Sequence, residues 1–274
     1  MLMNALVIVW RECLEAMLVI GILSAWVVRS RPEARRALWL GVAGGIGLAL
    51  ALAALMQGAL SEMDDRVQEG VQIGLILLAA ALMTHMVLWM QRHARGLRAE
   101  MEASLDRAVV RRGLWGIAAV AAIAVAREGA ETVIFLQGVG SSGNAWDLAL
   151  AAIAGFLLAA LTAWAAARGL RFLPMRTVFG VSSILLLAFA AGFIVLGVDR
   201  MIGMEWLPPG IDPLWDTSAW LDDGAGLGKW LADLFGYRAR PAATAVAAYA
   251  AYWLMLLALR FRRRLSGNMR IASA

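Results

Sequence analysis

Residues 2–28 read LMNALVIVWRECLEAMLVIGILSAWVV, and residues 114–139 read LWGIAAVAAIAVAREGAETVIFLQGV. Both stretches are long enough to cross a membrane as helices, which takes about 20 predominantly apolar residues. Each nevertheless contains the pattern Arg-Glu-x-x-Glu near its middle, beginning at Arg11 and at Arg127. One charged side chain at the bilayer centre costs about 2.5–3.5 kcal/mol even on a lenient insertion scale. Repeated charges of this kind indicate a functional site.

The composition is that of a membrane protein. Hydrophobic residues make up 62% of the 274 residues, whereas a soluble domain has about half. Repeated apolar runs of about 20 residues favour helices over a barrel, so we expect an all-α protein embedded in the lipid bilayer. Seven transmembrane helices are predicted, at residues 2–28, 38–60, 69–91, 114–139, 146–168, 177–198 and 242–260.

Arginines gather in alternate connections between these spans. The rich segments are 29–37, 92–113, 169–176 and 260–264, and the poor ones are 61–68 and 140–145. Cytoplasmic loops carry the excess of Lys and Arg, so we expect the N-terminus outside and the C-terminus inside. This predicts a multi-pass protein of the cell inner (cytoplasmic) membrane. Topology also explains the formal net charge of +5 without a nucleic-acid partner.

The two motifs predict an inverted repeat. Each motif opens a set of three spans, and because three is odd, the second set enters the membrane from the opposite side. Many secondary transporters follow this plan, with the substrate site near the midplane. We therefore expect a single transmembrane domain, 1–274, whose parts are repeat one at 1–91, repeat two at 114–198, an outer loop with a short interfacial helix at 199–241, and span seven at 242–260.

Helical spacing pairs the motif carboxylates. Residues three apart lie on one face of a helix, so each motif presents two glutamates on one face, about halfway through a ~30 Å hydrocarbon core. If the two motif helices face each other across the repeat axis, four carboxylates converge. The predicted metal site is therefore Glu12, Glu15, Glu128 and Glu131.

The motif arginines are placed to balance part of this charge. Arg11 lies four residues before Glu15, and Arg127 lies four residues before Glu131, which is within reach on a helix. Two arginines against four glutamates leave a negative surplus, and carboxylate oxygens prefer hard multivalent cations. A purely structural role as buried ion pairs is the alternative. It fits the surplus poorly, because desolvation offsets the attraction within buried pairs.

Further polar residues are weaker candidates for a cation pathway. Asp64, Asp65 and Glu69 lie on the predicted outer side, where acids raise the local cation concentration. Acids also collect outside simply because bases are kept inside, and a helix N-terminus favours a carboxylate by its dipole. His85, in the inner part of the third span, is a candidate transient ligand or a packing histidine.

The duplicated motif closely resembles that of the high-affinity iron permease family, also called oxidase-dependent iron transporters. The resemblance extends to Glu69-Gly70 and to Met86 through Arg92 in the third span. Four pieces of the outer segment resemble the bacterial branch, at residues 215–218, 227–229, 234–237 and 240–241, so the similarity covers nearly the whole chain. The duplication makes it specific.

This resemblance implies an iron permease that carries ferric, or else ferrous, iron across the cytoplasmic membrane. The family's motif glutamates and arginines map onto the six motif residues named above. Iron is then the transported substrate, and no permanently bound cofactor is implied. The resemblance also implies separate partner proteins, a periplasmic peroxidase or oxidase and a periplasmic metal-binding protein.

Three other functions stay open at this stage. The first is a permease for another heavy metal such as lead, since related permeases share the motif. The second is a non-transporting metal-sensing membrane subunit, in which the carboxylates bind metal that never crosses. The third is a membrane enzyme built on Ser182 or Ser183, but no histidine lies in a convincing supporting span. We therefore expect a transporter and not an enzyme.

Overall fold

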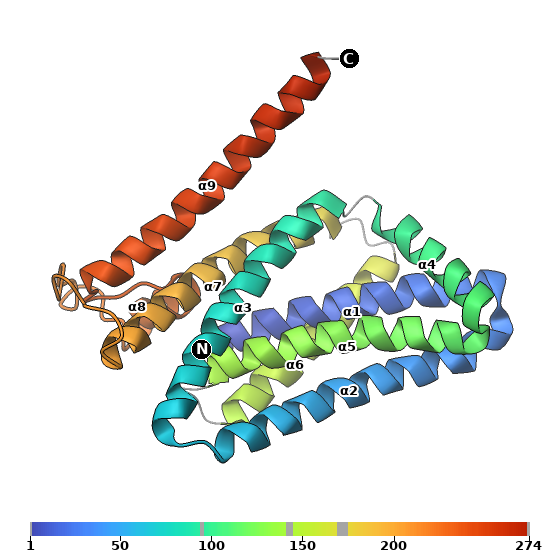
Figure 1. The fold of residues 1–274 in the computed structure, drawn as a ribbon, viewed down its shortest axis with the longest axis horizontal. Coiled ribbons are helices and arrows are strands. Elements are labelled where there is room, and N and C mark those ends of the chain that lie inside the picture. Colours follow the sequence, from blue (N-terminus) through green and yellow to red (C-terminus); the bar gives the residue numbers. More distant parts are fainter. Residues whose placement is uncertain (1, 94–95, 141–144, 169–174, 273–274) are drawn as a thin grey trace. The chain divides into compact units, whose positions relative to one another are not determined.

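The structure is a computed structural model that describes residues 2–93, 96–140, 145–168 and 175–272. Within this part every regular element is a helix, which confirms the all-α class. The elements are α1 (Leu2–Ser30), the short 3-10 helix η1 (Pro32–Ala34), α2 (Arg35–Ser61), α3 (Asp65–His93), α4 (Leu97–Arg112), α5 (Leu114–Gly140), α6 (Ala145–Ala167), α7 (Met175–Gly203), α8 (Gly226–Phe235) and α9 (Ala243–Ala272) (Figure 1).

Each predicted span corresponds to one long helix whose ends differ from the prediction by a few residues, except that α9 runs on to Ala272. The predicted interfacial helix is also present, as α8. The predicted connection 92–113 contains a further helix that the sequence did not predict, α4 at residues 97–112. The predicted connections 140–145 and 169–176 lie largely outside the described residues.

Helix α4 is anchored by apolar side chains, of which Leu105 is the most deeply buried, while Met101 and Val109 pack against the same cluster. Leu105 is fully buried in a cluster with Trp26 of α1, Leu38 of α2 and Ile117 of α5. Charged residues are interspersed along the rest of the helix, and Glu102 forms an ion pair with Arg29 at 3.3 Å. The arginines of this connection indicate its cytoplasmic side but give no sign of a helix within it.

Among the described residues, four helical segments are long and apolar enough to cross a membrane, judged by length and composition. They are Pro32–Ser61, Asp65–Gln91, Trp146–Ala165 and Gly180–Gly203. The motif helices α1 and α5 are of similar length, but each carries its three charged motif residues in the middle. Ala243–Leu259 is a shorter apolar helix. The count of seven spans stays a prediction.

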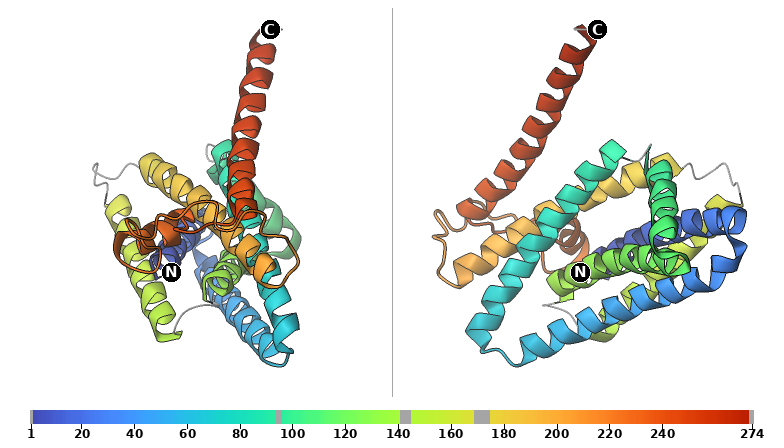
Figure 2. Two further views of the ribbon diagram at one scale, coloured as in Figure 1. Left: turned by 90° about the vertical axis from the view of Figure 1, so that its left-hand side faces the viewer. Right: turned by 45° about the vertical axis from the view of Figure 1, so that its right-hand side comes forward.

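The chain forms two compact units, residues 1–187 and 188–274. In the first unit the most extensive helix pairs are α2 with α5 and α1 with α6, and α1 also packs directly against α5. Figure 2 shows α1, α2 and α5 running alongside one another. The two motif helices are therefore neighbours, as the predicted site requires.

Glycines let the two extensive pairs approach to backbone contact. A Cβ atom at Gly45 of α2 would lie 2.7 Å from the carbonyl oxygen of Ala122 and 2.8 Å from the Cβ of Val125, both on α5. A Cβ atom at Gly155 of α6 would lie 2.6 Å from the carbonyl oxygen of Leu6 on α1. Small residues at such contacts are typical of membrane helices, where close van der Waals packing drives association.

The second unit contains the end of α7, α8, α9 and an ordered segment in place of the predicted loop. The Tyr237 hydroxyl lies 2.6 Å from the Thr217 hydroxyl and donates to the Leu221 carbonyl oxygen at 2.9 Å. Thr217 N donates to the Ala239 carbonyl oxygen at 3.0 Å. These bonds close the segment on itself, so the residues that resemble the bacterial branch hold its conformation.

Several acids of this segment are engaged in its structure. Asp199 forms an ion pair with Arg238 at 2.8 Å, and Asp216 forms one with Arg240 at 2.9 Å. Hydrogen bonds from Arg240, and to a smaller extent from Ser218, lower the pKa of Asp216 to about 2. Since these two carboxylates already have arginine partners, they are less available to attract a cation.

We predict that Gly45→Ala destabilises the protein while Gly44→Ala does not. The new methyl group at residue 45 meets the backbone of α5, and overpacking of this kind costs about 1–3 kcal/mol. Gly44 is exposed, and a Cβ atom there meets nothing within 4 Å. Thermal unfolding of the two purified variants in detergent measures the difference. Equal midpoints would contradict the backbone contact between α2 and α5.

Candidate metal centre

Three of the four predicted glutamates converge where α1 meets α5. One carboxylate oxygen from each of Glu12, Glu128 and Glu131 lies within 4.8 Å of the other two. Glu12 and Glu128 are buried, with 1% and 7% of their surface exposed, and Glu131 is half-buried. Hard cations bind oxygen ligands at about 2.0–2.6 Å. Oxygens at this separation therefore fit around a single ion.

Glu15 lies beside this group and is held by an arginine. Arg11 Nη2 is 2.7 Å from Glu15 Oε1, and Arg11 Nη1 donates to Glu12 Oε1 at 3.0 Å. On the other helix, Arg127 Nε donates to Glu131 Oε1 at 3.0 Å. Both predicted pairings across four residues are thus present in the structure.

The two arginines have different surroundings. The Arg11 side chain is 1% exposed, whereas that of Arg127 is 49% exposed. The Arg127 guanidinium lies 5.5 Å from the ring centroid of Trp89 on α3, within the range of a cation–π contact. The motifs are therefore equivalent in sequence and not in environment.

Carboxylate oxygens remain available at the centre. The Oε2 atoms of Glu12, Glu128 and Glu131 are buried, and no hydrogen-bond partner for them lies within the described part of the chain. Leaving a buried acceptor unsatisfied costs about 1–3 kcal/mol, and more for a charged group. Each of the three grouped glutamates therefore has a carboxylate oxygen without a described partner, which suits a cation.

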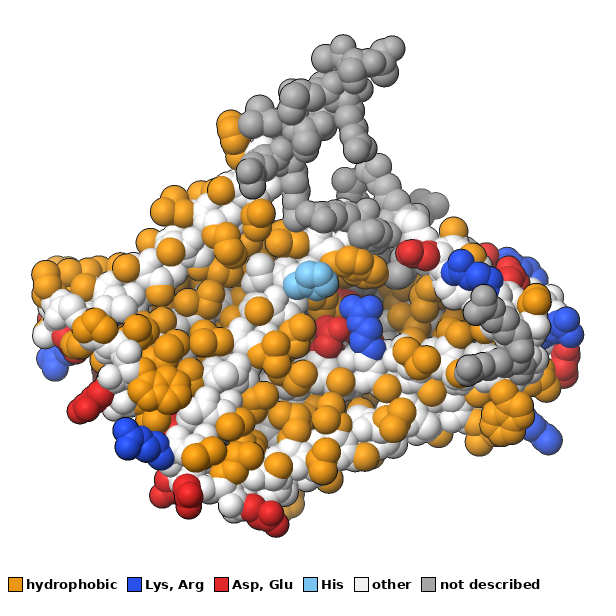
Figure 3. Space-filling view, in the orientation of Figure 1, with side chains coloured by type: hydrophobic (Ala, Val, Ile, Leu, Met, Phe, Trp, Pro, Cys, Tyr) orange, Lys and Arg blue, Asp and Glu red, His pale blue; other side chains and the backbone are white. Residues whose placement is uncertain are grey.

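The other predicted pathway residues lie apart from this centre. Asp64 and Asp65 are exposed where α2 turns into α3, and Glu69 is half-buried one turn further along. His85 is exposed on α3 and does not belong to the carboxylate group. Figure 3 shows one face, on which acidic side chains gather mainly at helix ends and a few charged ones lie within the hydrophobic surface.

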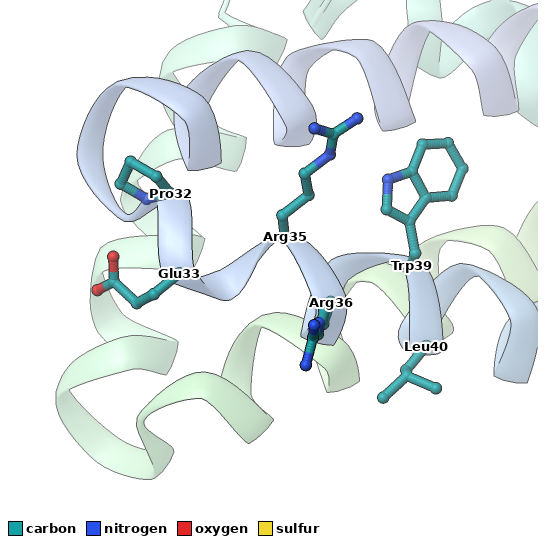
Figure 4. A pocket seen from close by; sticks show the side chains of 6 residues that line it. All are labelled: Pro32, Glu33, Arg35, Arg36, Trp39 and Leu40. Atoms are coloured by element: carbon teal, nitrogen blue, oxygen red, sulfur yellow. The ribbon is translucent and has the colours of Figure 1, made fainter.

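A separate pocket of about 780 Å³ lies where η1 meets α2. Figure 4 shows its lining, which is Pro32, Glu33, Arg35, Arg36, Trp39 and Leu40. Its one acid, Glu33, already faces Arg31 at 3.5 Å. The pocket contains none of the predicted site residues, so the candidate centre is identified by its carboxylates and not by an open cavity.

Comparison with known proteins identifies the family of the chain. Residues 2–264 match the Iron permease FTR1 family. The chain belongs to this family. Its resemblance to iron permeases is therefore confirmed, and with its apolar helices it is a multi-pass membrane protein whose family transports iron. Membership of a permease family also fits the expectation of a transporter.

Curated relatives cover most of the chain. The ferrous iron permease EfeU of Yersinia pestis is 29% identical over 258 residues, which is 93% of this chain and 91% of that protein. The ferrous iron permease EfeU of Escherichia coli O6:H1 is 29% identical over 262 residues, which is 91% of this chain and 92% of that protein. No solved structure matches the chain significantly.

Sequence reasoning missed the contribution of α3 to the centre. Met86 and Met90 accept hydrogen bonds from Arg11 at 2.9 and 3.7 Å, and Trp89 lies against Arg127. These three residues were noted only as part of the family resemblance. Their spacing of three and four residues places them on one face of a helix, which was the available signal.

We predict that Arg11→Gln destabilises the protein more than Arg127→Gln does. Removing Arg11 leaves the carboxylates of Glu12 and Glu15 without their buried counter-ion, which costs about 3–5 kcal/mol. The Arg127 pair is half exposed, and an exposed pair is worth about 1 kcal/mol or less. Denaturant unfolding of both variants measures the two losses. Equal losses would contradict the difference in burial.

Proposed function

We propose that this chain carries ferrous iron across the cytoplasmic membrane and binds it at the carboxylate centre. The observation that carries the proposal is the group formed by Glu12, Glu128 and Glu131, whose oxygens lie within 4.8 Å of one another. This group lies in a chain of the iron permease family. A cation there neutralises buried negative charge that two arginines balance only in part.

The ferrous state is favoured by the relatives. Sequence reasoning put ferric iron first, because an oxidase partner delivers ferric ion in the family that the motif resembles. The curated relatives from Yersinia pestis and Escherichia coli are named ferrous iron permeases. In this proposal ferric iron is the alternative, and uptake measured with and without a reductant separates the two.

The proposed topology has seven spans, an N-terminus outside and a C-terminus inside. Its inverted repeat is supported by reciprocal packing, since α1 pairs with α6 while α5 pairs with α2. In an inverted repeat α1 corresponds to α5 and α2 to α6. The pair of α1 with α6 then corresponds to the pair of α5 with α2. Glycines at both contacts, Gly155 in one and Gly45 in the other, extend the correspondence.

The partners and the location in the inner membrane belong to the same proposal. A periplasmic peroxidase or oxidase and a periplasmic metal-binding protein would deliver iron to the outer side. Asp64 and Asp65, exposed between α2 and α3, are outer acids placed to attract the cation. The centre itself lies on the motif helices, where the ion is held between the two sides.

Two alternatives remain testable. A permease for another heavy metal such as lead uses the same carboxylates, and competition between metals in vesicles separates it from an iron permease. A metal-sensing subunit binds iron but does not pass it, so uptake by the purified protein alone in liposomes excludes it.

We predict that Glu12→Gln, Glu128→Gln and Glu131→Gln each lower iron uptake by at least about tenfold. Loss of a group that supports a metal site typically has an effect of this size. Glu15→Gln is expected to have a smaller effect, because Glu15 lies outside the group of three and pairs with Arg11. The measurement is the initial rate of iron uptake into liposomes that contain each purified variant.

Glu33→Gln provides the matched control for this series, since Glu33 is exposed and lies in the separate pocket. It is expected to transport at the rate of the unmodified protein. Normal uptake by the variants of Glu12, Glu128 and Glu131 would refute the proposed centre.

A further inference from the structure

The buried Arg11 makes an unusual choice of hydrogen-bond acceptors. A guanidinium has five N–H donors, and carboxylate oxygens match its geometry best. Within α1, Arg11 pairs with carboxylate oxygens. Toward α3, its acceptors are the sulfur atoms of two methionines. Its Nη1 atom lies 2.9 Å from Met86 Sδ, and its Nη2 atom lies 3.7 Å from Met90 Sδ. A thioether is only a weak acceptor.

One nitrogen of Arg11 contacts both an oxygen and a sulfur acceptor. Nη1 is 3.0 Å from Glu12 Oε1 and 2.9 Å from Met86 Sδ. Glu12 belongs to the carboxylate group, and Met86 is 3% exposed. The positive charge of Arg11 therefore lies where an oxygen and a sulfur, from different helices, face the same point.

We propose that the Met86 thioether is a ligand of the transported ion, which takes the position of Arg11 Nη1 between Glu12 and Met86. This rests on the proposed function, and it adds α3 to a centre whose carboxylates come only from α1 and α5. The resulting donor set combines carboxylate oxygens with one sulfur. Hard ions are suited to oxygen alone, whereas thioethers favour softer ones. The sulfur therefore selects ferrous iron over ferric iron and over the harder Mn²⁺.

The alternative role of Met86 is packing. Methionine fills irregular gaps in cores because its side chain is flexible. Met83 offers a matched control, since it is a fully buried methionine on the same helix and lies outside the described contacts of Arg11. Leucine has a similar volume, so both Met86→Leu and Met83→Leu keep the packing nearly unchanged.

The test is uptake by purified protein in liposomes under reducing, oxygen-free conditions, with Fe²⁺ and Mn²⁺ in competition. Met86→Leu is expected to lower the preference for Fe²⁺ over Mn²⁺ by about tenfold, the size of effect typical of lost support at a metal site. Met83→Leu is expected to keep the preference. If both variants keep it, the thioether is not a ligand.

X-ray absorption at the iron edge supplies a second readout that needs no variant. The unmodified protein loaded with Fe²⁺ is expected to show one sulfur in the first shell of the metal. A shell of oxygen alone would overturn the inference even if Met86→Leu failed to fold.

Glu12→Gln in the same uptake assay separates the sulfur ligand from the carboxylate centre on which it rests. If it abolishes uptake while Met86→Leu keeps the preference for Fe²⁺, the carboxylate centre stands and the sulfur ligand is wrong. If Glu12→Gln transports normally, the proposed function itself fails, and the sulfur ligand fails with it.

Discussion

The centre of this protein depends on the ion pairs of Arg11. A carboxylate buried without a counter-ion is strongly destabilising, and α1 carries two carboxylates within one turn. Arg11 contacts both of them and is almost completely buried. Its further bonds to Met86 and Met90 tie α1 to α3. One side chain thus allows charge to be placed inside an apolar bundle and fixes the helix that carries it.

Helix packing then sets the geometry around this charge. The contacts at Gly45 and Gly155 bring each motif helix to backbone contact with a partner. Such contacts leave little freedom for the helices to slide, because the atoms on both sides are backbone. The carboxylates of Glu12 and Glu128 therefore approach each other from helices that glycine contacts hold in addition to the bonds of Arg11, and such support on rigid elements preorganises a cation site.

Much of this arrangement could be predicted from the sequence. Apolar runs located the long helices, and helical spacing gave the pairing of Arg11 with Glu15 and of Arg127 with Glu131. Helix α4 was not predicted, because its arginines indicate a cytoplasmic connection and its sequence has no long apolar run. Its buried contact through Leu105 depends on tertiary packing. The methionines on α3 were missed because a contact between distant segments leaves no local pattern. The unequal burial of the two arginines likewise depends on neighbours that the motif does not specify.

The reciprocal helix pairs limit how such a protein can move. Many transporters alternate by rocking one repeat as a rigid body against the other. Here each close pair takes one helix from residues 1–91 and one from residues 114–198, so the two segments are interleaved. Rocking one segment away from the other would pull both glycine contacts apart. Conformational change that keeps these pairs intact therefore involves elements outside them, such as α3, which contacts the motif arginines through side chains.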